Sequence, residues 1–280
     1  MKKKKVSLLG GAWGAARFAF GVIGWIAKKV WAFFVWLLNL LKNLLKKAQE
    51  SRRLAEVERS RPVAKAAYLP LKGMAASEGE LNKFESRLYS DRSLIGLILG
   101  SRGSGKSALG MRVLENVVAR TGRKAYCMGF DRKDLPAWVE PVESLEQVRN
   151  NSFLLVDEGG VEFSSRSAMS SANRLLGKLL LISRHKDINV LFISQNSANL
   201  EVNAIRQSDY LLLKPPSLLQ LDFERKAIRD IYERVKDKFV RYRSERGILY
   251  VYSDQYRGFA SNGLPSFWSE SLSKSYRNRK

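Results

Sequence analysis

Short uninterrupted hydrophobic runs alternate with longer amphipathic segments from about residue 90 onward. Such runs are typical of strands buried on both faces of a parallel sheet. The segments between them have helical spacing, and this alternation indicates an α/β fold with a mainly parallel central sheet. The expected strands are residues 94–100, 123–130, 153–156, 188–196, 209–214 and 248–254, and the expected helices are residues 107–122, 171–183 and 218–240.

The N-terminal pattern is different. Residues 6–27 are almost wholly apolar, and residues 30–47 become amphipathic after a Lys28–Lys29 pair. The first block has the roughly 20 residues that a bilayer-spanning helix needs, although Arg17 lies in its middle. The segment also contains small residues four apart and tryptophans, which suit helix packing in lipid and the membrane interface. We expect residues 1–47 to form membrane-associating hydrophobic or amphipathic helices.

Several arrangements of this segment remain open. A signal peptide, or one crossing with the N-terminus inside, would place the α/β domain outside the cell. Two helices packed on the protein's own core are a further alternative. Helices that lie in, or dip into, the cytoplasmic leaflet avoid export, and their lysines would meet anionic headgroups. We favour this last arrangement, and the sequence does not decide between in-plane and hairpin insertion.

Charge is concentrated at the N-terminus. The chain carries 49 basic and 27 acidic residues, a net charge of +22. Residues 1–62 contribute 14 basic and 3 acidic residues, so half of the excess lies there. Such an excess predicts attraction to nucleic acid or to anionic lipid. We expect a charged helix or linker over residues 48–89, followed by the α/β domain over residues 90–280 with a basic C-terminal tail.

The chain has one cysteine, Cys127, and one histidine, His185. A disulfide within the chain is therefore impossible, and a Cys/His zinc site is excluded. This usage suits a reducing compartment.

A glycine-rich turn lies between the first expected strand and the helix that follows it. Residues 100–107, GSRGSGKS, match the phosphate-loop pattern G-x-x-x-x-G-K-[S/T] in full. Backbone N–H groups and the helix N-terminus would hold the β-phosphate, Lys106 would neutralise β- and γ-phosphate oxygens, and Ser107 would bind Mg²⁺. The sequence therefore predicts ATP and Mg²⁺ as ligands. The expected nucleotide-binding residues are Gly100, Ser101, Arg102, Gly103, Ser104, Gly105, Lys106, Ser107 and Ala108.

Polar residues follow two other expected strands. Asp157 and Glu158 come directly after residues 153–156, and Gln195 ends the strand at residues 188–196. Ligands of parallel sheets bind at the carboxyl ends of the strands. We expect Asp157 to hold Mg²⁺, Glu158 to polarise the attacking water, and Gln195 to contact the γ-phosphate or that water.

With these residues in place, the chain resembles the FtsK–HerA superfamily of RecA-like DNA-pumping ATPases. It is most similar to viral genome-packaging ATPases and to the zonular-occludens-toxin-like assembly ATPases of filamentous phages. The resemblance covers about residues 90–270 and rests on GSRGSGKS, LLVDEGG, SRHKDINVLFISQN and IRQSDYLLLK. It implies a RecA-like P-loop fold and a homo-oligomeric ring, usually a hexamer, in which an arginine of one subunit reaches its neighbour's γ-phosphate. Arg166, Arg174 and Arg184 are the candidates, and we favour Arg184. We expect His185 to pack beneath the sheet.

The resemblance also implies a central DNA channel with sequence-independent, salt-sensitive contacts. Basic groups in residues 233–247 and 273–280 could supply them, with Tyr242 and Tyr276 stacking on bases. Solvated helix-face charges are the plainer interpretation of both clusters.

Three functions remain open at this point. The first is a membrane-associated motor that packages viral DNA, in contact with capsid proteins and on the cytoplasmic side or a virion membrane. The second is an assembly ATPase that extrudes a virus, with assembly proteins as partners. The third is a membrane-held nucleotide switch or scaffold, against which Glu158 and Gln195 argue. The sequence does not reveal ring size or DNA strandedness.

Overall fold

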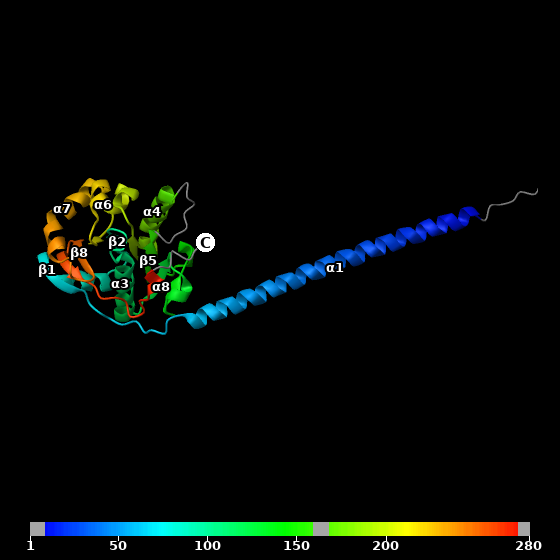
Figure 1. Ribbon diagram of the computed structural model, residues 1–280, viewed down its shortest axis with the longest axis horizontal. Helices are drawn as coiled ribbons and strands as arrows, with labels where there is room; N and C mark the ends of the chain where they lie inside the picture. The colour runs from blue at the N-terminus through cyan, green and yellow to red at the C-terminus, as the bar shows by residue number, and fades with distance from the viewer. Residues whose placement is uncertain (1–8, 159–167, 274–280) are drawn as a thin grey trace, which may run out of the picture. The chain divides into compact units, whose positions relative to one another are not determined.

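The structure, a computed structural model, describes residues 9–158 and 168–273 (Figure 1). The chain forms two compact units, Met1–Arg59 and Ser60–Lys280. The second unit contains the whole sheet and the glycine-rich turn, so the two units are described separately.

The first unit is a single helix, α1 (Leu9–Ser60), of 52 residues. The sequence suggested hydrophobic or amphipathic helices over residues 1–47 and a charged helix or linker after them, whereas the structure has one continuous helix as far as Ser60. No proline lies within this stretch and lysine is a good helix former, so the Lys28–Lys29 pair does not interrupt the helix. The helix ends before Arg61, which precedes Pro62 and is therefore disfavoured from helical geometry.

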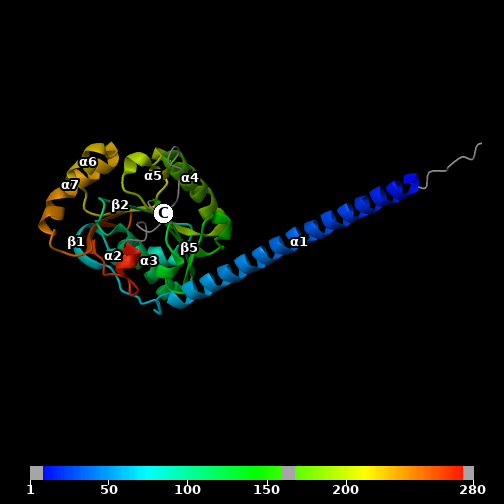
Figure 2. The same ribbon diagram turned by 45° about the vertical axis from the view of Figure 1, so that its right-hand side comes forward.

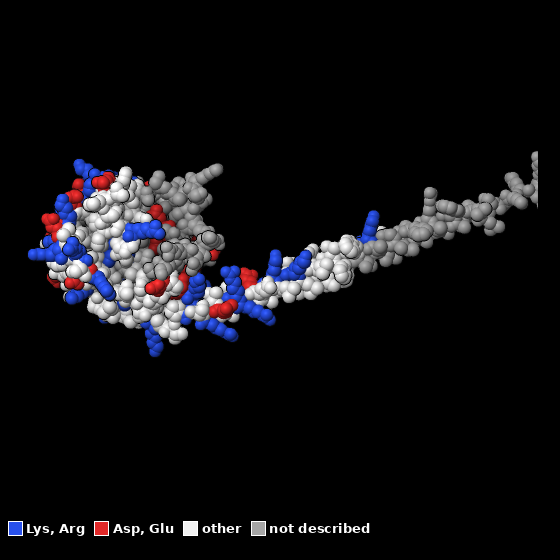
Figure 3. Space-filling model, viewed as in Figure 1, with Lys and Arg blue, Asp and Glu red and all other residues white. Residues whose placement is uncertain are grey.

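The middle of α1 exposes large apolar side chains. In Figure 3 its uncharged surface gives way to basic and acidic side chains toward its C-terminal end. Within residues 9–158 and 168–273, no helix is both long and apolar enough to cross a lipid bilayer. The exposed apolar residues of α1 include Trp25, Trp31, Phe33, Phe34, Trp36, Leu40, Leu41, Leu44 and Leu45.

The second unit is built on a nine-stranded sheet with the order β1-β9-β8-β7-β2-β6-β5-β3-β4. The run from β7 to β4 is parallel, and β8, β9 and β1 extend it as an antiparallel edge. This confirms the predicted α/β class with a mainly parallel sheet. The strands are β1 (Lys72–Gly79), β2 (Ile95–Leu99), β3 (Lys124–Met128), β4 (Val139–Pro141), β5 (Ser152–Asp157), β6 (Asn189–Ile193), β7 (Tyr210–Leu213), β8 (Ile248–Ser253) and β9 (Tyr256–Ser261).

Helices cover both faces of the sheet (Figures 1 and 2). Alternate side chains of one strand enter two separate cores, so that Ile98 packs on the α3 face and Leu97 on the α7 face. Gly122, at φ 66°, ends α3 as the sequence predicted. One face carries α2 (Leu81–Ser90), α3 (Lys106–Thr121) and α8 (Glu270–Ser273); the other carries α4 (Ala168–Lys186), α5 (Val202–Arg206), α6 (Leu218–Phe223) and α7 (Lys226–Arg241).

Two segments depart from the expected organisation. Residues 60–89 are part of the α/β unit rather than a linker, because β1 pairs with β9 and α2 packs on the core. The helix expected over residues 218–240 is interrupted at Glu224, whose buried carboxylate accepts a 3.0 Å hydrogen bond from the Ser197 N–H. That contact draws the chain toward the end of β6 and separates α6 from α7.

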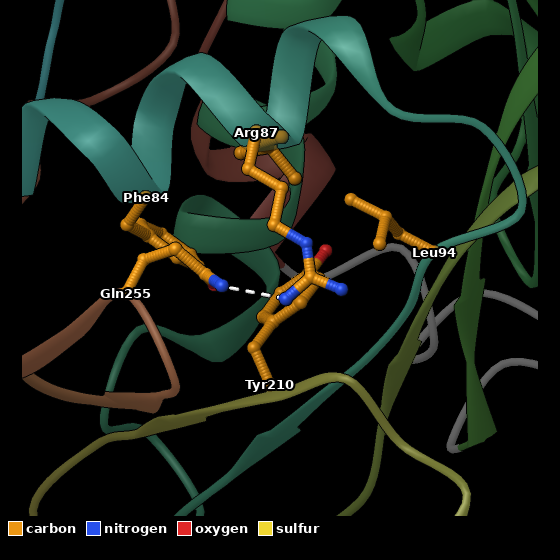
Figure 4. A pocket seen from close by; sticks show the side chains of 6 residues that line it. Phe84, Arg87, Leu94, Tyr210 and Gln255 are labelled. Carbon is orange, nitrogen blue, oxygen red and sulfur yellow. Dashed lines mark hydrogen bonds between the residues drawn. The ribbon is translucent and has the colours of Figure 1, made fainter.

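The helix α2 is fastened at the amino end of β2, where Phe84 and Arg87 lie close to Tyr210 (Figure 4). Phe84 packs edge-on against Tyr210 with ring centroids 5.4 Å apart. Arg87 donates to Gln255 Oε1 at 2.9 Å and to Asp209 at 3.3 Å, and Asp209 also accepts from the Ile95 N–H at 2.8 Å. These contacts fix the start of the strand that carries the turn.

Candidate active site

The glycine-rich turn connects β2 to α3 and has the geometry of a phosphate-binding loop. Gly103 and Gly105 have φ values of 79° and 87°, which residues with a side chain rarely adopt. The loop leads directly into α3, and the N-terminus of a helix suits an anion because its first N–H groups have no partner within the helix. The hydroxyl of Ser104 is buried and has no hydrogen-bond partner among the described residues. The loop therefore fits a bound polyphosphate.

Lys106 is the first residue of α3 and is only 8% exposed. Its Nζ donates to the carbonyls of Gly100 and Ser101, both at 2.8 Å. Burial lowers the pKa of this lysine, and the charges of Asp157 and Glu158 oppose that shift. When a nucleotide binds, the Lys106 ammonium could exchange these carbonyl partners for phosphate oxygens.

Ser107 and Asp157 join α3 to the carboxyl end of β5. The Ser107 hydroxyl donates to Asp157 Oδ2 at 2.8 Å. A hydroxyl beside a carboxylate is an oxygen pair of the kind that Mg²⁺ prefers. Within the described ranges, no group of three or more His, Cys, Asp and Glu side chains could hold a metal ion, so phosphate and water oxygens would have to complete the coordination.

Glu158 follows directly and is held by the neighbouring strand. Its Oε2 accepts a 2.5 Å hydrogen bond from the Ser194 hydroxyl at the end of β6. Burial raises the pKa of Glu158, while the hydrogen bonds from Ser194 and the Gln195 backbone and the charge of Lys106 lower it; Asp157 raises it further. A partly buried carboxylate of raised basicity is suited to accept a proton from water.

The strand order explains why these residues meet. Because β2, β6 and β5 are parallel neighbours in this order, their carboxyl ends lie side by side, and the residues that follow them come together at one edge. Ser194, which is 1% exposed, makes the contact with Glu158 that sequence reasoning did not anticipate. The signal available in the sequence was a hydroxyl residue immediately before the strand-end glutamine.

Gln195 lies at the same edge with an exposed side chain. Its backbone faces Glu158, and its carbonyl accepts from Gln220 Nε2 of α6 at 2.9 Å. The contact of its side chain with a γ-phosphate or water stays a prediction.

The structure separates Arg184, the favoured trans-acting arginine, from this site. Arg184 is exposed on the last turn of α4, beside the start of β5, where the Asn151 N–H donates to the Lys186 carbonyl at 2.9 Å. That is the edge of the sheet opposite the phosphate loop, so Arg184 is not part of its own subunit's site. Arg174 is exposed near the start of α4, and Arg166 lies outside the described residues.

His185 is exposed on the same turn of α4, so the expectation that it packs beneath the sheet is wrong. Its position among charged residues at the end of the helix directs it to solvent.

The basic segment at residues 233–247 is a surface of mixed charge, and Figure 3 shows basic and acidic side chains interspersed over α7. Lys236 pairs with Glu233 at 2.7 Å. Tyr242 is half-buried and packs on Phe259, with ring centroids 5.7 Å apart, so it is not free to stack on a base as expected. The tail at residues 274–280, with Tyr276, lies outside the described residues.

Comparison with known proteins finds likeness among solved structures. No protein-family model and no curated protein matches the chain. The chain is similar to viral genome-packaging ATPases. B204, the DNA-packaging ATPase from Sulfolobus Turreted Icosahedral Virus, is 14% identical with a TM-score of 0.45, over 62% of this chain and 99% of that chain. The genome-packaging NTPase B204 from Sulfolobus turreted icosahedral virus 2, in complex with AMPPCP, is 15% identical with a TM-score of 0.43, over 62% of this chain and 98% of that one.

ATPases 2 and 3 of EccC from Thermomonospora curvata, in complex with a signal sequence peptide, are also similar. Their identity is 14% and their TM-score 0.39, over 72% of this chain and 42% of that chain. The chemistry of the site rests on the geometry of its own residues.

Proposed function

We propose that this chain is an ATPase whose site lies at the carboxyl edge of β2, β5 and β6. The observation that carries this proposal is the convergence of Lys106, the Ser107–Asp157 pair and the Ser194–Glu158 pair at one edge. A phosphate loop alone would suit a switch. The buried carboxylate aimed at the same edge supplies the base that hydrolysis needs.

Each side chain has a distinct part in the reaction. The loop N–H groups and Lys106 bind and orient the β- and γ-phosphates. Ser107 and Asp157 would hold Mg²⁺, which neutralises phosphate charge when bound. Glu158 accepts a proton from the water that attacks the γ-phosphorus, and the bond to the ADP oxygen breaks. Ser194 holds the Glu158 carboxylate in place.

The work that hydrolysis drives is proposed to be the translocation of DNA into a viral capsid by a hexameric ring. The net charge of +22 favours a polyanionic substrate. Exposed arginines at positions 241, 243 and 246 lie just before β8, which runs antiparallel to β7 and so begins at the edge of the sheet that carries the phosphate loop. Sequence-independent phosphate contacts from these arginines would lie on the same edge of the sheet as the site of hydrolysis.

The test is ATP turnover with and without DNA in a chain that lacks residues 1–59. The cut keeps Arg61, whose guanidinium donates to the carbonyls of Leu135, Pro136 and Val139 in the α/β unit. Stimulation by double-stranded DNA that weakens with salt supports the motor. Equal turnover without DNA, with single-stranded DNA and with double-stranded DNA would contradict it.

The exposed apolar side chains of α1 favour a second candidate, an assembly or extrusion ATPase held at a membrane on its cytoplasmic side. An amphipathic helix with lysines beside tryptophans suits an anionic lipid surface. Flotation of the full chain with anionic vesicles, but not of the chain lacking residues 1–59, supports membrane association. Membrane association without DNA-stimulated turnover favours assembly over packaging, and ATP binding without turnover would leave a nucleotide switch.

A further inference from the structure

Beneath the phosphate loop lies a second lysine, Lys214, at the end of β7. It is 1% exposed, although it is a charged residue type. Its backbone is fixed on both sides, because its N–H donates to the Leu99 carbonyl at 2.8 Å and its carbonyl accepts from the Tyr232 hydroxyl at 3.0 Å. The side chain therefore has a defined starting point directly beside the end of β2.

The side chain runs along the floor of the loop. A Cβ placed on Gly100 would lie 2.6 Å from Lys214 Cβ, and one placed on Gly105 would lie 3.9 Å from Lys214 Nζ. The Lys214 amine thus lies close to Gly105, the residue that immediately precedes α3. The next residue, Pro215, accepts hydrogen bonds at its carbonyl from the N–H and hydroxyl of Ser101, at 3.2 and 2.9 Å, so the loop is tied to this segment.

The Lys214 amine has a neutral partner, the Asn262 amide oxygen at 3.3 Å. Three titratable side chains lie on the segments around it: Lys106 of α3 binds the Gly100 carbonyl, Tyr232 of α7 binds the Lys214 carbonyl, and Tyr250 of β8 is paired with Leu213. Burial, and after it the charge of the Glu224 carboxylate, raises the pKa of Tyr232 well above its usual value, so it stays neutral and supplies no anion. Burial lowers the pKa of Lys214 to about 7, and no carboxylate in the part of the chain that the structure describes opposes this shift. A buried cation without a counter-charge is costly.

We propose that Lys214 is a positioning residue for the nucleotide, supporting the phosphate loop from below and supplying a positive charge opposite the bound polyphosphate. This inference rests on the proposed function, because the counter-charge comes from the phosphates of ATP. When they enter the loop, the amine takes up a proton and the charged form becomes favourable. In the absence of that charge, the neutral amine avoids the cost of burial.

The experiment uses the full chain carrying Glu158→Gln, which removes both hydrolysis and the titration of that carboxylate. ATP binding is measured by calorimetry near pH 7.5 in two buffers of different ionisation enthalpy, with and without Lys214→Met. The methionine fills similar space without a charge. Lys236→Met is the matched control, since that lysine is exposed and paired with Glu233.

Lys214→Met is expected to weaken ATP binding about tenfold, to abolish most of the net proton uptake, and to leave the melting temperature unchanged or higher. Inorganic tripolyphosphate should show the same loss, because the effect is on phosphate. Lys236→Met should change neither quantity. Unaltered ATP affinity and proton uptake in Lys214→Met would overturn this inference and leave the proposed ATPase function standing. Absence of ATP binding in the parent chain would overturn the proposed function and this inference with it.

Should the methionine variant fail to fold, the parent chain and Lys214→Gln decide the matter. Either no proton uptake in the parent, or full affinity and uptake in the glutamine variant, would overturn the assignment.

Discussion

The Ser194 hydroxyl donates a 2.5 Å hydrogen bond to Glu158 Oε2, so the end of β6 holds the carboxylate that follows β5. The two residues directly follow adjacent parallel strands and share the edge that carries the phosphate loop. This contact orients the carboxylate and stabilises its charged form at the same time, because the hydroxyl donates to the ionised oxygen.

Ser194→Ala is expected to lower ATP turnover and to move the acid limb of its pH profile to higher pH. Burial already raises the pKa of Glu158, and the Ser194 hydrogen bond opposes that rise. Removing the hydroxyl raises the pKa further, so the carboxylate is protonated, and inactive as a base, at higher pH than in the parent. The measurement is kcat against pH at saturating ATP.

Ser194→Thr is the control for this prediction, because it keeps the donor. Its acid limb should stay near that of the parent chain. An alanine variant with the parental pH profile would show that Ser194 does not act on the base.

Glu158→Gln is expected to keep nucleotide binding and to lower turnover by roughly 10²–10⁴-fold. The amide preserves shape and hydrogen bonding but cannot accept the proton. Turnover and binding of a fluorescent ATP analogue, measured on one preparation, separate the two effects. Normal turnover in this variant would remove the assignment of Glu158 as the base.

Lys106→Ala is expected to abolish nucleotide binding, since it removes the buried ammonium that the carbonyls of the phosphate loop hold beside the proposed phosphate position. Lys124→Ala, at an exposed position of β3, provides the comparison and should bind as the parent does. Equilibrium binding of ATP to both variants is the readout. Retained affinity in Lys106→Ala would mean that the loop does not hold the nucleotide.

The elements that could be predicted from sequence are those whose hydrophobic pattern is complete within a short local segment. The fully buried strands β2, β5 and β6 read as continuous apolar runs, and the glycine loop has a spacing that few other structures need. The edge strand β1, KGMAASEG, was missed because it is mostly exposed and rich in small residues. Its conformation depends on pairing with β9, almost 200 positions away in the sequence, which no local pattern reveals.

Part of the candidate site could also be predicted, because several of its residues belong to short local motifs. Lys106, Ser107, Asp157 and Glu158 follow from spacing within short segments. Ser194 and Lys214 matter because β6 and β7 both lie beside β2, and strand order is a tertiary property. Tyr242 was given a role on DNA because its neighbours are basic, whereas the packed Phe259 ring determines where it lies.

Arg184→Ala is expected to lower turnover about 10³-fold while leaving nucleotide binding intact, if this arginine acts on a neighbouring subunit. Its exposed position at the edge opposite its own loop excludes contact with the nucleotide of its own subunit, so any part that it takes in catalysis would be in trans. Mixing Arg184→Ala with Lys106→Ala subunits tests this directly, because mixed rings contain some interfaces with an intact loop and an intact arginine. The same mixing experiment with Arg174→Ala is the comparison. If activity recovers only in the mixture of Arg174→Ala with Lys106→Ala, the trans-acting role belongs to Arg174.

Glu115→Leu is expected to lower the free energy of unfolding of the α/β unit by about 3–5 kcal/mol. The Glu115 carboxylate is fully buried on α3, pairs with Arg112 at 2.9 Å, and accepts from the N–H groups of Ala67 and Ser266 at 3.0 Å each. Its loss leaves a buried guanidinium without its counter-charge and two backbone donors unpaired. Urea unfolding of the chain lacking residues 1–59, with and without the substitution, measures this change in the free energy of unfolding.

The exposed pair Glu80–Lys83 has the same three-residue spacing and provides the matched control, so Glu80→Leu should cost less than about 1 kcal/mol. Combining Glu115→Leu with Arg112→Met should recover part of the loss, because the uncompensated charge is removed as well. Equal costs for Glu115→Leu and Glu80→Leu would mean that burial does not set the strength of the α3 pair, and that the segments at Ala67 and Ser266 are held by other contacts.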